Sequence, residues 1–268
     1  MPGKIRVGIG GWTYEPWRGV FYPDGLAHKR ELEYASRQLS SIEINGTYYS
    51  SFKPDSWKKW RSETPDGFVF AMKASRFCTN RRVLADAAQS VERFVGQGLV
   101  ELGDRLGPIN WQFMATKKFD AEDIESFLKL LPRQAGKLPL RHALEVRHAS
   151  FKDPRFYDLC RKYNAAIVYA HDDEFPEIDE PTADFTYARL MKSEEKHKAG
   201  YRPADLELLR GIRHLLYGEG YTIRGVQRIL REQGQRFVQS VWQPGAAQPV
   251  LQPDEDAAAE PDQLAPDE

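Results

Sequence analysis

The chain contains seven short apolar stretches, and most of them are followed by a stretch with helical periodicity. Alternating strands and helical crossovers predict a parallel sheet. Seven strands are one fewer than a closed (β/α)8 barrel contains. We therefore expect an α/β, TIM-barrel-like fold that could stay incomplete at the last strand. The predicted strands are 5–11, 42–45, 67–73, 107–113, 140–148, 165–172 and 183–190, and the predicted helices include 28–39, 84–99, 121–131 and 154–163.

Polar side chains lie near the end of most of these apolar stretches. In (β/α)8 barrels the reacting groups come from the carboxyl ends of the strands, which share one rim. Any one of these residues could be part of a structural ion pair, but so many on one rim favour a functional site. The residues are Glu43, Asn45, Lys73, Gln112, Glu145, Arg147, His148, His171, Asp172 and Arg189.

Acid/base catalysis is assigned to Glu43, Glu145 and His171, because carboxyl and imidazole groups in a partly dry site can have shifted pKa values. The same three residues and Asp172 could instead ligate a divalent metal. The sequence has no tight ligand-spacing motif, so we assign no metal ligand and leave the cofactor open.

The predicted ligand is a small molecule with an anionic group, such as a phosphate or nucleotide. Lys73, Arg147 and Arg189 would hold that group. Aromatic residues near the first two strands would either stack a ring of the ligand or form a packed plug. The other predicted ligand contacts are Trp12, Tyr14, Tyr48, Tyr49, Asn45, Gln112 and His148.

Composition argues against several classes of partner. The formal net charge of −1 gives no overall attraction to nucleic acid or to anionic membranes. No run approaches the roughly 18 apolar residues of a membrane-spanning helix, and no secretory segment precedes the first strand. We expect a cytoplasmic protein whose two cysteines, Cys78 and Cys160, are reduced.

Six motifs follow one another along the first 200 residues: 10–14 (GGWTY), 43–49 (EINGTYY), 68–73 (FVFAMK), 107–112 (GPINWQ), 145–148 (EVRH) and 184–190 (DFTYARL). In these motifs and their order the chain resembles the YecE-like family, the TIM barrels called domain of unknown function 72. The resemblance implies a barrel with a polar, aromatic pocket but no settled activity. One departure is Asn80, where the family tends to have a histidine, which weakens any proton-transfer role at that position.

The pattern changes after residue 200. Two apolar stripes at helical spacing, within 206–216 and 223–230, are separated by Gly218 and Gly220. This segment is similar to the second half of a MerR-type winged-helix DNA-binding domain, without the helix-turn-helix pair that reads the major groove. We interpret the join as a fusion. The two helices would pack on the barrel, and residues 237–242 could supply a substitute eighth strand.

Two alternative functions depend on this segment. Basic helices can contact phosphate, so a DNA-associated, regulator-like protein is the second hypothesis. Self-association through the apolar stripes is the third. The arginines that would contact DNA are Arg210, Arg213, Arg224 and Arg228.

The predicted domains are a barrel (1–200), a helical segment (201–242) and a tail (243–268). The tail is rich in Gln, Ala, Pro, Asp and Glu and carries no basic residue. Such a composition predicts a disordered acidic tail.

Overall fold

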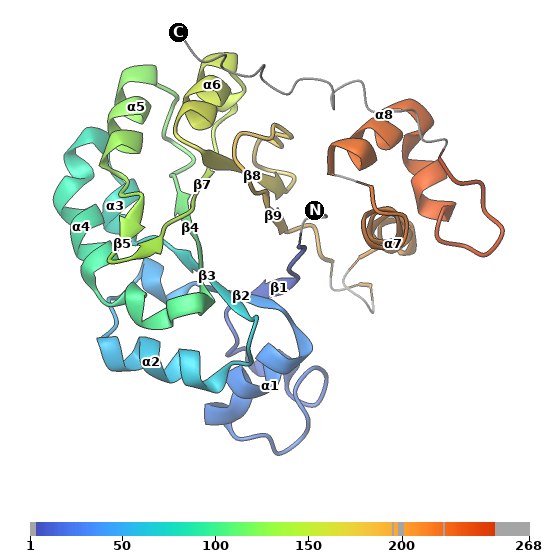
Figure 1. The fold of residues 1–268 in the computed structure, drawn as a ribbon, viewed down its shortest axis with the longest axis horizontal. Helices are drawn as coiled ribbons and strands as arrows, with labels where there is room; N and C mark the ends of the chain where they lie inside the picture. Colours follow the sequence, from blue (N-terminus) through green and yellow to red (C-terminus); the bar gives the residue numbers. More distant parts are fainter. Residues whose placement is uncertain (1–3, 195, 198–200, 222, 250–268) are drawn as a thin grey trace, which may run out of the picture. The chain divides into compact units, whose positions relative to one another are not determined.

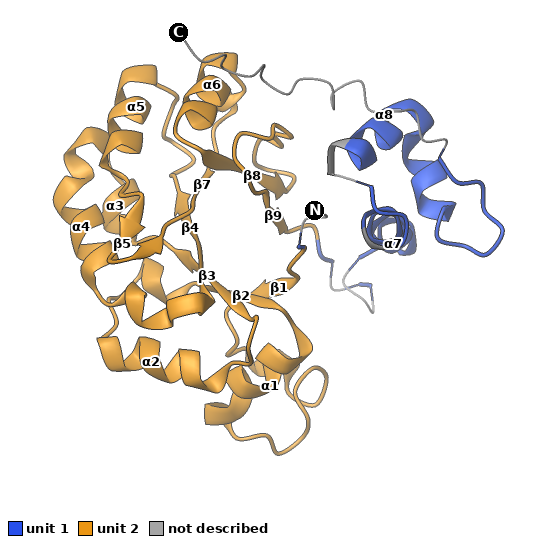
Figure 2. Ribbon diagram, viewed as in Figure 1, with its two compact units in different colours: residues 1–4, 193–268 blue, residues 5–192 orange. Residues whose placement is uncertain are grey.

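The computed structural model describes residues 4–194, 196–197, 201–221 and 223–249. They belong to two compact units (Figure 2), one formed by residues 5–192 and the other by residues 1–4 with 193–268. Most of the tail that was predicted to be disordered, residues 250–268, lies outside the described residues.

The larger unit is built on a seven-stranded sheet (Figure 1). Its strands are β1 (Gly8–Gly10), β2 (Ser41–Ile44), β3 (Val69–Lys73), β4 (Leu106–Gln112), β7 (His142–Glu145), β8 (Ala165–His171) and β9 (Tyr187–Leu190), paired in that order. All neighbouring strands run parallel. The sheet curls as part of a barrel, with β1 and β9 at its ends. The predicted incomplete TIM-barrel-like fold is therefore confirmed.

Helices cover the outer face of this sheet (Figure 1). Two of them begin with an aspartate cap: Asp120 accepts hydrogen bonds from the backbone of the first turn of α5, and Asp153 does the same for α6. A small antiparallel pair, β5 (Gln134–Ala135) and β6 (Leu138–Pro139), follows α5. The helices are α1 (Glu31–Gln38), α2 (Pro54–Glu63), α3 (Arg76–Thr79), α4 (Ala88–Gly96), α5 (Ala121–Leu130) and α6 (Pro154–Lys162).

The two faces of the strands differ in chemistry, because side chains alternate along a strand. Ile42, Phe70 and Trp111 belong to the main apolar core, together with buried residues of the helices. Ala143 and Ala166, which are register partners, form a second apolar cluster on the inner face of the sheet. The inner face changes from apolar to polar toward the carboxyl ends of the strands, and this change positions the candidate site.

The smaller unit contains α7 (Pro203–Tyr217) and α8 (Ile223–Ser240). Leu215 on α7 and Ile229 and Val238 on α8 are buried in a core of their own. The prediction of a substitute strand at 237–242 is wrong, because residues 237–240 form the end of α8, after a kink at Gly234, and Val238 is buried in this helical core. No described helix is both long and apolar enough to cross a bilayer.

Candidate functional site

Polar side chains from five strands of the larger unit gather on the inner face of the sheet. Asn110 is the register partner of Ala143, and Gln112 is that of Glu145, so these side chains continue the inner face beyond the alanines. We call this group the inner cluster. Its members are Glu43, Lys73, Asn110, Gln112, Glu145, Arg147, Tyr187 and Arg189.

Glu145 lies at the centre of the inner cluster and is fully buried. Its Oε1 accepts hydrogen bonds from Gln112 at 2.6 Å and from Arg147 at 3.0 Å. Arg189 donates to both carboxylate oxygens, at 2.9 and 3.0 Å. Burial raises the pKa of the Glu145 carboxyl, but Arg189, the hydrogen bond from Asn110 and Arg147 outweigh that effect, and the pKa is lowered. Glu145 is therefore held as a carboxylate and is poorly suited to donate a proton.

Glu43 is the second carboxylate of the inner cluster. The Asn110 Nδ2 atom lies 3.2 Å from Glu43 Oε2 and 2.8 Å from Glu145 Oε2, so these two oxygens are within about 6 Å of each other. The Tyr187 hydroxyl also donates to Glu43 Oε2. Burial and then the charge of Glu43 raise the pKa of Tyr187 well above its usual value. Tyr187 is thus a neutral hydrogen-bond donor that fixes the Glu43 carboxylate.

Lys73 ends β3 next to Asn110, its register partner on β4. Its Nζ lies 5.2 Å from the centroid of the Tyr48 ring. In the described part of the chain the Lys73 Nζ has no hydrogen bond and no ion pair within 4 Å. Burial and the positive charge of Arg189 lower the pKa of Lys73, and the attraction of the two glutamates does not restore it.

Three buried acceptor oxygens of this region form no hydrogen bond with described residues: Glu43 Oε1, Asn45 Oδ1 and Asn110 Oδ1. The NH2 group of Asn110 faces two carboxylates, which fixes its oxygen on the other side. An unsatisfied buried acceptor costs about 1–3 kcal/mol. The arrangement therefore suits a molecule that brings hydroxyl or amino donors.

The inner cluster carries more positive than negative charge, since Lys73, Arg147 and Arg189 face two glutamates. Arg189 is engaged by both glutamates, at 3.5 Å from Glu43 and 2.9 Å from Glu145. Arg147 is one-quarter exposed and lies 4.4 Å from the Phe175 ring centroid. Lys73 and Arg147 are consequently the cations with capacity for an additional anion.

Two of the predicted aromatic contacts lie beside Lys73. Tyr48 contacts the lysine, and its hydroxyl is hydrogen-bonded to the side chain of Asn80. Tyr49 packs edge-on against Tyr48, with 5.0 Å between centroids, and is 65% exposed. A role of these two rings in stacking on a ligand stays a prediction.

The other two predicted aromatic contacts have packing roles. Trp12 packs against Trp60 and Phe70, which belong to the core between sheet and helices. Tyr14 packs against Trp17 and is half exposed. The sequence left open whether these aromatic residues stack on a ligand or form a packed plug. The contacts of Trp12 fit the packed plug.

The two predicted histidines do not join the inner cluster. His148 Nδ1 accepts the backbone N–H of Ser150 at 3.1 Å and caps the turn after β7. His171 stacks on Tyr169, with 6.4 Å between centroids. It follows Ala170, the register partner of Arg189, so alternation turns His171 to the opposite face of β8.

The alternative set of four metal ligands is not brought together. His171 faces away from Glu43 and Glu145, and Asp172 accepts the backbone N–H of Glu174 at 2.7 Å. Among the described residues, no group of three or more His, Cys, Asp or Glu side chains is arranged to hold a metal ion. The paired glutamates are instead surrounded by cationic and amide donors.

Two members of the inner cluster were missed in the sequence, namely Asn110 and Tyr187. The signal was their spacing: Asn110 is two residues before Gln112, and Tyr187 is two residues before Arg189. Residues two apart share a face of a strand. Asn110 therefore shares a face with Gln112, and Tyr187 with Arg189, and both of these partners were already candidate site residues.

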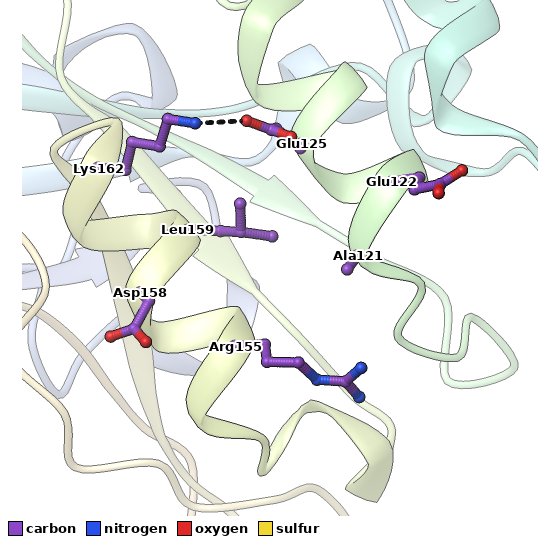
Figure 3. Close-up of a pocket in the computed structure, with 7 residues that line it drawn as sticks. All are labelled: Ala121, Glu122, Glu125, Arg155, Asp158, Leu159 and Lys162. Carbon is purple, nitrogen blue, oxygen red and sulfur yellow. Dashed lines mark hydrogen bonds and ion pairs between the residues drawn. The ribbon is translucent and has the colours of Figure 1, made fainter.

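A depression of about 320 Å³ lies elsewhere, between α5 and α6 (Figure 3). Lys162 forms an ion pair with Glu125 at 2.7 Å across it. Arg155 pairs with Asp153, and Asp158 pairs with Arg161. Because its charges are neutralised locally and it lies on the helical layer, this depression is a surface feature rather than part of the inner cluster.

The arginines predicted to contact DNA lie on α7 and α8. Arg210 pairs with Glu207 at 2.7 Å, and Arg228 lies 3.8 Å from an acidic residue one turn later. Arg213 is exposed, and the side chain of Arg224 lies outside the described residues. Pairs of this kind are typical of a solvated helix surface, and DNA contact stays a prediction.

Comparison with known proteins connects the chain to one family. The family model described as "Protein of unknown function DUF72" matches residues 6–237. This range includes the inner cluster, α7 and most of α8, and the comparisons give no support to a MerR-like segment or a fusion. The helix–glycine–helix pattern that suggested MerR is common to many helical hairpins.

Two curated relatives are UPF0759 proteins. YunF of Bacillus subtilis is 26% identical over 183 residues, which are 66% of this chain and 62% of YunF. YecE of Escherichia coli K12 is 26% identical over 147 residues, which are 55% of this chain and 50% of YecE. The chain thus spans between one half and two thirds of the length of these relatives.

Two solved structures share the fold. A DUF72 family protein of Thermotoga maritima gives a TM-score of 0.59 at 21% identity, with 84% of this chain and 87% of that chain covered. A DUF72 family protein of Enterococcus faecalis gives 0.53 at 17% identity, with 77% and 84% covered. At such identities the likeness shows the fold alone. The family match over residues 6–237 shows that the chain belongs to the DUF72 family, whose function is unknown.

Proposed function

We propose that the inner cluster binds a small molecule carrying an anionic group and hydroxyl or amino groups, and that Glu43, held in place by Tyr187, exchanges a proton with it. The observation that carries the proposal is an excess of positive charge beside two buried carboxylates and three acceptor oxygens without donors. All of these groups lie toward the carboxyl ends of parallel strands, where barrels of this kind place their reacting groups.

The anionic group belongs with Lys73 and Arg147. Arg189 is already engaged by both glutamates, whereas Lys73 has no partner within hydrogen-bonding distance among the described residues. Arg147 keeps a quarter of its side chain exposed, and a guanidinium can bind phosphate or carboxylate through two parallel hydrogen bonds. Tyr48 and Tyr49 would flank the same ligand.

The acid/base step belongs with Glu43. Its Oε2 accepts from Asn110 and Tyr187, while Oε1 forms no hydrogen bond, lies 3.5 Å from Arg189 and is the oxygen that would take a proton of the ligand. Glu145 acts as a fixed negative charge that orients Arg189 and Asn110. The two carboxylates thus have different environments and different roles.

Calorimetric titration tests the proposal, first with inorganic phosphate and then with sugar phosphates and nucleoside monophosphates. We expect Lys73→Met and Arg147→Met each to weaken binding about tenfold or more, because a hydrogen bond to a charged group contributes ~1.5–3 kcal/mol. Lys162→Met, on the depression between α5 and α6, is the matched control and should not change binding. Unchanged affinity in both site variants would refute the proposal.

A further inference from the structure

We propose that Lys73 is the nucleophile of the inner cluster and forms an imine with the carbonyl carbon of an aldehyde or ketone ligand. This inference rests on the proposed function and narrows its ligand to a small anionic carbonyl compound, whose anionic group Arg147 holds while Lys73 reacts with its carbonyl carbon. It depends on the position of Lys73, on the absence of a direct partner and on the acid/base groups beside it.

Comparison with another buried lysine shows how unusual the surroundings of Lys73 are. Lys117 is also largely buried, but its ammonium donates to the Arg82 carbonyl oxygen at 2.8 Å and pairs with Asp123. The Lys73 ammonium has no such acceptor in the described part of the chain, and its Nζ lies 5.2 Å from the centroid of the Tyr48 ring. A partly buried amine without an acceptor is costly as an ammonium ion and less costly as a neutral amine.

Burial and the nearby positive charges favour the neutral form of the Lys73 amine. Burial has the largest effect, followed by the positive charge of Arg189, and Arg147 acts in the same direction. Glu145 and Glu43 oppose these effects without cancelling them, so the pKa of Lys73 is lowered. Each unit of lowering gives roughly tenfold more free amine at neutral pH, and the free amine is the form that attacks a carbonyl carbon.

The imine step needs proton transfer but no oxidant or reductant. The Lys73 nitrogen bonds to the carbonyl carbon, and the carbonyl oxygen is protonated to a hydroxyl group. That hydroxyl then leaves as water when the C=N bond forms. The two protons that the amine loses are the two protons of this water. Glu43, hydrogen-bonded to Tyr187 on the same face of the sheet, can accept each proton from nitrogen and return it to oxygen.

Reductive alkylation of the full chain tests the reactivity of the amine. The probe is formaldehyde with sodium cyanoborohydride at neutral pH, and mass spectrometry of peptides follows each lysine over time. We expect Lys73 to be methylated several-fold faster than Lys59, which is exposed, and faster than Lys117. Exposure cannot explain this order, because Lys73 is the less exposed member of the first pair.

Pyruvate with the same reductant tests the ligand class. We expect a reduced adduct at Lys73 that inorganic phosphate suppresses, and that forms several-fold more slowly in Glu43→Gln while methylation of Lys59 is unchanged. If phosphate binds but Lys73 reacts no faster than Lys59, the imine inference fails and the proposed function stands. Selective methylation without a pyruvate adduct would overturn the anionic carbonyl class. If neither phosphate nor pyruvate binds, both proposals fail.

Discussion

A buried charge is costly unless other charges and hydrogen bonds compensate it, and Glu145 is the clearest case in this chain. Arg189 donates to both of its oxygens. Glu145→Gln keeps the shape of the side chain but leaves the Arg189 charge without that partner. We expect the free energy of unfolding to fall by about 3 kcal/mol at neutral pH, as measured by urea denaturation followed by tryptophan fluorescence.

The loss of stability caused by Glu145→Gln should be largest near neutral pH and should decrease in acid. The pKa of Glu145 is lower in the folded protein than its usual value. Its stabilising contribution is therefore complete above the unfolded value of about 4.3 and is lost as pH falls through the lower folded value. The stability difference between the two proteins should be constant from neutral pH to about pH 5 and shrink in stronger acid. A difference that persists in strong acid would contradict this role.

Lys73 should have the opposite effect on stability, because its charged form is destabilising in the folded protein, although stability again rises with pH. Its folded pKa is lowered, so the unfolded chain binds more protons between the two pKa values, and stability rises with pH in that window. Neutral pH lies well below the unfolded pKa of about 10.4, so burying this amine costs stability there. Lys73→Met should therefore raise the melting temperature by about 2–4 °C, equivalent to ~1 kcal/mol for a chain of this size.

Lys117→Met is the matched control for Lys73→Met. Lys117 has an ion pair with Asp123 and a hydrogen bond to a backbone carbonyl oxygen, so its removal should lower the melting temperature. Differential scanning calorimetry of both variants would measure the two shifts. A decrease in both would show that Lys73 is stabilising, and the account of its environment would be wrong.

At the scale of elements, the contact between β3 and β4 holds Lys73 beside Asn110. The register of these strands is irregular between Phe70 and Met72, and Gly107 permits a close approach there. A Cβ at Gly107 would lie 2.3 Å from the Phe70 carbonyl oxygen. Gly107→Ala should therefore destabilise the protein by about 1–3 kcal/mol.

Gly96→Ala is the control, because a Cβ at this last residue of α4 meets no atom within 4 Å. Alanine has less backbone entropy to lose in a helix, so this change should stabilise the protein by about 0.5–1 kcal/mol. Thermal unfolding of both variants measures the two changes. Equal effects would show that the close approach at Gly107 is unimportant.

The sequence predicted the strands well because apolar stretches bounded by polar residues leave few alternatives. It also predicted that Glu43, Lys73, Glu145 and Arg189 share a rim, because parallel strands place their carboxyl ends together. It did not predict which face each residue occupies. His171 also ends a strand, but it lies one position away from the inner face, and a shift of one residue reverses a side chain.

Helix and strand could not be distinguished at residues 237–242. This segment is short and contains Val238 and Val241, whose shape favours strands. In the structure both valines are buried in the core of α7 and α8. The conformation of this segment is determined by tertiary packing, which the local sequence pattern does not reveal.

At the scale of the whole molecule, each unit has an apolar core of its own, and this leads to the last prediction. In the smaller unit, α7 and α8 approach closely at Gly211, where a Cβ would lie 1.6 Å from the Val238 carbonyl oxygen. Gly211→Ala must separate the two helices and loosen Leu215 from its neighbours. We expect faster hydrogen exchange throughout α7 and α8, as measured by mass spectrometry of peptides.

The same variant shows whether the inner cluster depends on these helices. If each core is sufficient for its own unit, Gly211→Ala should leave exchange in β2 and β7 and the binding of phosphate unchanged. Gly107→Ala is the reciprocal variant, and it should speed exchange in β3 and β4 without affecting α7. Faster exchange in the strands of Gly211→Ala, or loss of phosphate binding, would show that the two units are energetically coupled. The C-terminal helices would then be part of what keeps Glu43, Lys73 and Glu145 in position.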